Sequence, residues 1–206
     1  IPTANPNNFG DPIVALNTLD GWSTVAPWTV PFSVEPATTS LVAGQGFRWF
    51  EVALTGPGGA VTRVVRELVA NTDYVVSKTT SDPKVVAIVP LKPLKQLTSY
   101  MAVVTNQASD ANGNNATPDQ TYFLTQRTSP LCAGGVSTDP LLPNATACAL
   151  EPLRQLTNAQ EAAAASAGVD RSKIVVSFVA TTQSITPVLQ ATQQQNQPSP
   201  VTVANS

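Results

Sequence analysis

Short runs of apolar and β-branched residues recur along the first 125 residues of the chain. Turn-forming stretches such as Gly56–Gly59 and Asp110–Asn115 separate them, because Gly, Pro, Asp and Asn favour the backbone angles and local hydrogen bonds of turns. Regularly spaced short strands of this kind predict an antiparallel β-sandwich. The runs are 28–34, 47–54, 61–68, 74–78, 85–91, 99–105 and 121–125.

The segment from residue 11 to residue 19 has a helical pattern instead. Asp11 is a suitable helix N-cap, and Pro12 fits the first helical position, where its missing N–H costs nothing. Asp20-Gly21 then ends the segment. We expect a short helix here, ahead of the first strand.

A second helix is expected over residues 151–167. Pro152 stands at its start, leucines follow at helical spacing, and Gly168 is a stop signal. The strong apolar run 173–182 comes directly afterwards. The chain is therefore predicted to complete its sheet late, after a helical insertion.

Composition limits the classes of partner. The chain is 42% hydrophobic, enough for a real core, and only 12% of its residues are charged, with a net charge of −2. With so few charges and no positive net charge, the composition does not indicate binding to nucleic acid or to an anionic membrane surface. The chain begins at Ile1 with no initiator Met, so we expect a processed or excised segment.

Cys132 and Cys148 are the two cysteines, and they enclose a loop rich in Pro and Gly. A disulfide in an exported protein is the favoured interpretation, and two buried thiols are the alternative. Closing a loop of this length stabilises a fold by about 3 kcal/mol.

The sequence lacks the residues of common catalytic sites. It contains no histidine, so neither a Ser-His-Asp nor a Cys-His arrangement can be built, and Gly21-Trp22-Ser23 lacks the second glycine of a nucleophile elbow. Asp110, Asn112 and Asn114 alternate as in a calcium loop, but the glycine is misplaced and no glutamate closes the loop, which favours a polar turn. We expect no catalytic residue, no cofactor and no metal site.

Aromatic residues gather in the first quarter of the chain. Trp22 and Trp28 form a candidate aromatic surface for lipid, glycan or protein. Core packing is the favoured alternative, because large aromatic side chains are mostly buried.

Three segments, taken together, resemble one family. They are DPIVALNTLDGWSTVAPWTVPFS at 11–33, VPLKPLKQLTSYMAVVT at 89–105 with DANGN at 110–114, and the stretch 153–184. Their order resembles the N-terminal region of bacterial extracellular virulence factor lipases, in which an α/β-hydrolase domain follows this region. The piece 91–114 is also similar to the last strands of bacterial immunoglobulin-like domains.

The resemblance implies a domain organisation. We expect a mainly β fold, an immunoglobulin-like antiparallel β-sandwich with a helical insertion before the last strand. Residues 1–26 would form an N-terminal extension with a short helix, and 27–185 the sandwich, including a disulfide loop at 127–149 and the helix at 151–167. Residues 186–206, rich in Gln, Ser and Pro, would form a linker toward a missing C-terminal domain.

The resemblance also implies a function. The family's catalytic serine and histidine would lie beyond residue 206, so this chain is expected to be a non-catalytic accessory or scaffold domain of a secreted or cell-surface lipase or esterase. Its partners would be the C-terminal α/β-hydrolase domain and a lipid or ester substrate, and not nucleic acid. The alternative is a surface-exposed immunoglobulin-like binding or adhesin domain that recognises lipid, glycan or protein.

Overall fold

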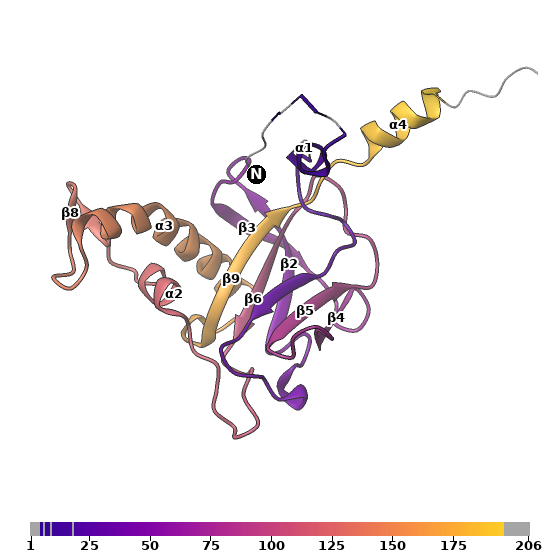
Figure 1. The fold of residues 1–206 in the computed structure, drawn as a ribbon. Helices are drawn as coiled ribbons and strands as arrows, with labels where there is room; N and C mark the ends of the chain where they lie inside the picture. The colour runs from indigo at the N-terminus through magenta and orange to yellow at the C-terminus, as the bar shows by residue number, and fades with distance from the viewer. Residues whose placement is uncertain (1–4, 6, 9, 18, 196–206) are drawn as a thin grey trace, which may run out of the picture.

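The computed structural model describes residue 5 and residues 7–8, 10–17 and 19–195 (Figure 1). The described chain is mainly β, in antiparallel sheets. One sheet has the order β1 (Trp28–Pro31), β5 (Val85–Pro90), β4 (Tyr74–Lys78). The other has the order β3 (Val61–Glu67), β2 (Phe47–Leu54), β6 (Ser99–Thr105), β9 (Ile174–Thr181).

The two sheets share one core. Trp28 of β1 lies edge-on to Trp49 of β2, with ring centroids 5.1 Å apart, and Trp49 packs against Tyr74 of β4 at 5.7 Å. All three side chains are buried in the same cluster. Aromatic side chains from opposite sheets therefore hold the sandwich together.

The four-stranded sheet is buried on both faces. Along β2, Phe47 and Trp49 belong to the core between the sheets, whereas Phe50 and Val52 belong to a second core on the outer face. Because successive side chains of a strand point to opposite faces, this alternation needs cover on both sides.

The strand order agrees with the expected immunoglobulin-like sandwich. The sheets match strands B-E-D and C′-C-F-G of such folds, with Trp49 on the strand in position C. Near the start of the strand in position F, the Tyr100 hydroxyl accepts a hydrogen bond from the backbone N of Lys95 at 3.1 Å, as in a tyrosine corner. Ala102 is buried two residues later, where antibody domains carry a cysteine.

A helical insertion separates β6 from β9, as the sequence predicts. It contains α2 (Gln120–Thr125), the hairpin β7 (Cys132–Ala133) and β8 (Val136–Ser137), α3 (Asn144–Ser166) and the 3₁₀ turn η2 (Arg171–Lys173). Ala163 and Ala164 of α3 pack on the outer face of the four-stranded sheet. The other end of α3, with the hairpin, projects beyond the sheet (Figure 1).

The strand expected at 121–125 is wrong, because these residues form helix α2. Asp119 caps the helix: its carboxylate accepts a hydrogen bond from the backbone N of Tyr122 at 2.8 Å. The cap and the burial of Tyr122 outweigh the β preference of the sequence.

The second helix begins earlier than the sequence predicts. It starts at Asn144 instead of residue 151, with Pro143 at the N-cap, so Pro152 lies inside it. The first turns are fixed from outside the helix, by the Cys132–Cys148 disulfide and by a 2.7 Å hydrogen bond from the backbone N of Leu131 to Glu151. These tertiary links offset the hydrogen bond that Pro152 cannot donate.

The remaining elements are one helix near each end of the described chain and a short 3₁₀ turn between β1 and β2. Helix α1 (Pro12–Asn17) is confirmed, and Asp11 accepts a 2.9 Å hydrogen bond from the backbone N of Ile13. A 3₁₀ turn, η1 (Thr38–Ser40), precedes β2. Helix α4 (Thr186–Gln195) occupies the first part of the expected linker, and 196–206 lie outside the described residues. Among the described residues, no helix has the length and apolar character needed to cross a membrane.

Candidate functional site

Trp22 lies in the segment before β1, at the point where this segment meets the end of the last strand, β9. Its backbone N donates to the carbonyl of Thr181 at 2.8 Å, and its carbonyl accepts from the backbone N of Gln183 at 2.8 Å. These bonds form a parallel bridge to Thr182, and the residue remains 52% exposed. The backbone of Trp22 is therefore fixed while its indole faces solvent.

Gly21 allows this close approach. A Cβ atom at this position would lie 2.6 Å from the backbone N of Gln183 and 2.6 Å from the carbonyl carbon of Thr182. Any larger residue would push the two segments apart. Helix α1 ends at Asn17, before the Asp20-Gly21 pair that was predicted to end it, and Gly21 instead places Trp22.

A loop before β6 joins the same region. The Thr182 hydroxyl donates to the carbonyl of Lys95 at 2.5 Å and accepts from the backbone N of Thr98 at 3.0 Å. The side-chain oxygen of Gln96 accepts from the backbone N of Ile185 at 2.8 Å, just before α4. Three segments distant in sequence are therefore locked at one end of the sandwich.

These three segments carry exposed apolar side chains. Helices α1 and α4 both lie at this end of the molecule (Figure 1). Exposed hydrophobic residues gathered on adjoining segments are typical of an interaction surface. We call the exposed apolar residues of this end the apical face, and they are Leu19, Trp22, Leu97, Ile185 and Leu189.

The structure separates the two tryptophans of the candidate aromatic surface. Trp28 is 2% exposed and packs between Trp49 and Phe178, so it belongs to the core. Only Trp22 can contribute to a binding surface. The neighbouring Ser23 hydroxyl accepts hydrogen bonds from the backbone N of Val25 and of Ala26, which gives it a role in a turn.

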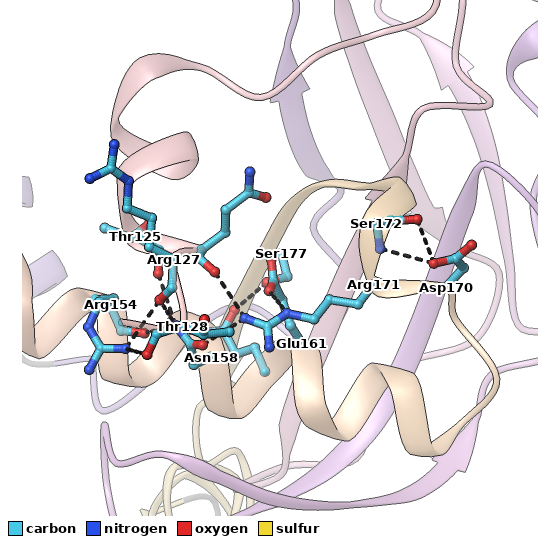
Figure 2. A network of polar contacts seen from close by, with 12 residues as sticks. Thr125, Arg127, Thr128, Arg154, Asn158, Glu161, Asp170, Arg171, Ser172 and Ser177 are labelled. Atoms are coloured by element: carbon cyan, nitrogen blue, oxygen red, sulfur yellow. Dashed lines mark hydrogen bonds and ion pairs between the residues drawn. The ribbon is translucent and has the colours of Figure 1, made fainter. Parts of the chain in front are cut away.

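The insertion contains a polar network that the sequence analysis does not identify (Figure 2). Glu161 of α3 is 1% exposed, and its carboxylate accepts from the Tyr122 hydroxyl at 3.0 Å and from Arg171 Nε at 2.6 Å. Burial raises the pKa of Glu161. Arg171 Nη2 also donates to the carbonyl of Gln126 at 2.9 Å and to Asn158 at 2.7 Å. The network ties α2, α3 and η2 together.

A second part of this network holds the backbone that follows α2. Arg154 Nη1 donates to the carbonyls of Arg127 and Thr128 at 3.2 and 3.1 Å. Its other nitrogens pair with Glu151, and this pairing lowers the pKa of Glu151 to about 2. Backbone carbonyls that no strand or helix satisfies are thus paired with side chains.

The loop with Asp110 is a self-contained turn. Its carboxylate accepts from the backbone N of Asn112 and of Asn114 at 2.9 and 2.8 Å, and from Asn114 Nδ2 at 2.8 Å. Both carboxylate oxygens of Asp110 accept hydrogen bonds within the loop, which supports the polar turn. Within the described residues, no three His, Cys, Asp or Glu side chains are grouped as metal ligands.

Comparison with known families points in one direction. A family model described as bacterial virulence factor lipase N-terminal matches residues 2–205, nearly the whole chain. No curated protein matches the sequence.

Proposed function

The chain belongs to the bacterial virulence factor lipase N-terminal family, and from this membership we propose that it is a non-catalytic accessory domain of a secreted or cell-surface bacterial lipase. In this role it supports an α/β-hydrolase domain of the same protein, by holding it or by assisting substrate access. The family match over residues 2–205 is the observation that carries the proposal.

The chemistry of the chain supports a non-catalytic role. The sequence has no histidine to serve as general base, and it has no G-x-S-x-G elbow. Its most buried carboxylate, Glu161, is paired with Arg171 and hydrogen-bonded by Tyr122. These contacts connect α2, α3 and η2, which is consistent with a structural role for Glu161.

We assign the contact with the hydrolase domain to the apical face. Its backbone is rigidly held by the Trp22 bridge and by Thr182, so little conformational entropy is lost when a partner covers it. Trp22 offers a half-exposed indole of the kind that dominates binding energy at interfaces.

The alternative is an immunoglobulin-like adhesin domain that recognises lipid, glycan or another protein. The exposed Trp22 favours it as well, because aromatic side chains bind all three classes of partner. The two proposals differ in whether a domain of the same protein covers the apical face.

An ester hydrolysis assay tests the non-catalytic assignment. We expect the purified 206-residue chain to show no turnover of short-chain or long-chain esters above that of a heat-denatured sample. A serine hydrolase inhibitor identifies contaminating activity in the same preparation. Turnover that survives further purification and the inhibitor would contradict a non-catalytic role.

A further inference from the structure

A groove of about 570 Å³ opens between the two sheets, at the end of the sandwich away from α1 and α4. It lies between β1 and β9, which are edge strands of opposite sheets, and under the loop of residues 106–119 (Figure 1). We propose that this groove binds a single acyl chain of an uncharged ester.

The described residues contain no strand in one position of the immunoglobulin pattern, and this leaves the groove open. Such folds place a further strand beside the one in the position of β1. In the described chain the segment before β1 crosses to the far end of β9, where Trp22 bridges to Thr182. The opening between β1 and the start of β9 is left without this cover.

Apolar side chains line the groove. Val30 and Phe32 come from β1 and its continuation, Val104 from β6, Val176 from β9, and Pro118 from the loop. Val30 and Val104 belong to the core, so the groove reaches the sandwich interior. Its volume lies within the range of about 300 to 1,000 Å³ that ligand pockets have.

The charges of the lining disfavour an anionic ligand. Asp110 and Asp119 are the ionisable residues among those that line the groove, and both are acidic. The hydrogen bonds that Asn114 donates to Asp110 lower the pKa of that carboxyl, so it stays charged at neutral pH. A fatty acid carboxylate or a phosphate headgroup would be repelled, whereas an ester finds neutral polar partners in Ser33 and Asn115.

The choice of an ester over other uncharged apolar chains rests on the proposed lipase function. The apolar lining of the groove, its acidic residues and its opening to solvent are observations that do not depend on the proposed function. Failure of one proposal can therefore be told from failure of the other, because ligand binding and cover of the apical face are measured at opposite ends of the sandwich.

The test is a titration of the 206-residue chain with monohexanoyl-, monooctanoyl- and monodecanoyl-glycerol below their micelle concentrations. We expect affinity to rise about three- to fourfold for each added methylene until the groove is filled. Decanoate, which has a charged head, is expected to bind at least about tenfold more weakly than monodecanoyl-glycerol.

Two matched variants locate the binding. Val34 lines the groove mouth and is 58% exposed, and Val136 on the β8 hairpin is 57% exposed. Val34→Asp should weaken binding at least about tenfold with an unchanged Tm, whereas Val136→Asp should leave binding as it is. An affinity independent of chain length, equal binding of decanoate, or full binding by a folded Val34→Asp variant would overturn the inference. Self-association of the chain through this face with no acyl binding would overturn it too.

Discussion

Replacing Trp28 with alanine should lower the free energy of unfolding by about 3–5 kcal/mol. The indole is 2% exposed and packs against Trp49 at 5.1 Å and Phe178 at 5.5 Å, so its loss leaves a cavity between the two sheets. Urea denaturation followed by circular dichroism measures the change.

Trp22→Ala is the matched control, since it removes the same side chain from the apical face. Trp22 is 52% exposed and its structural bonds come from the backbone, so we expect a loss below about 1 kcal/mol. Equal losses in the two variants would contradict the assignment of Trp28 to the core and Trp22 to a surface.

Removing Arg171 should have the second largest effect. Arg171→Ala takes away the cation 2.6 Å from Glu161, a carboxylate that is 1% exposed. Breaking a fully buried pair costs about 3–5 kcal/mol, and because Arg171 is 36% exposed and screened by water we expect about 2–4 kcal/mol at neutral pH. The free energy of unfolding from urea titrations measures it.

The deficit of Arg171→Ala should shrink in acid. Burial already raises the pKa of Glu161, and loss of the neighbouring cation raises it further. A carboxyl whose pKa is higher in the folded than in the unfolded protein stabilises the fold below its unfolded pKa, and this stability is lost as the pH rises through the folded pKa. The free energy of unfolding of the variant should therefore be closer to that of wild type near pH 5 than at pH 7.

A double variant checks that Glu161 is the group responsible. In Glu161→Gln no buried carboxyl remains at this position, so the further loss when Arg171→Ala is added to Glu161→Gln should be nearly the same at both pH values. A deficit in Arg171→Ala that does not change between these pH values would contradict a buried, ionised Glu161.

Local patterns were enough to predict most strands. Alternating apolar residues and turn signals placed β2 and β6, whose bounds Phe47–Leu54 and Ser99–Thr105 agree with the predicted runs. The helical insertion was also visible, because a helical pattern precedes the strong apolar run of β9.

Tertiary contacts explain what the sequence did not predict. Helix α2 is built from Thr, Tyr and Phe, which favour strands in isolation, and it depends on the Asp119 cap. Pro152 indicated a helix start, but the disulfide and Glu151 extend the helix back to Asn144.

The candidate site was predictable only in part. Trp22 could be named from composition, but nothing local separates it from Trp28, because burial depends on which segment lies opposite each one. Glu161 was missed because the buried stripe of α3 includes Arg154 and Thr157, polar residues that a hydrophobic pattern does not register. The groove lies between edge strands β1 and β9, which are far apart in sequence, so a local sequence pattern does not predict it.

Hydrogen exchange tests the central claim most directly, by comparing the 206-residue chain alone with the same chain in its complete protein. If a hydrolase domain covers the apical face, peptides spanning 19–25 and 183–195 exchange more slowly in the complete protein, and Trp22→Asp restores fast exchange there. The β8 hairpin serves as an internal reference and should be unchanged. Identical exchange of the apical peptides in the two forms, with protection elsewhere or nowhere, would contradict the account.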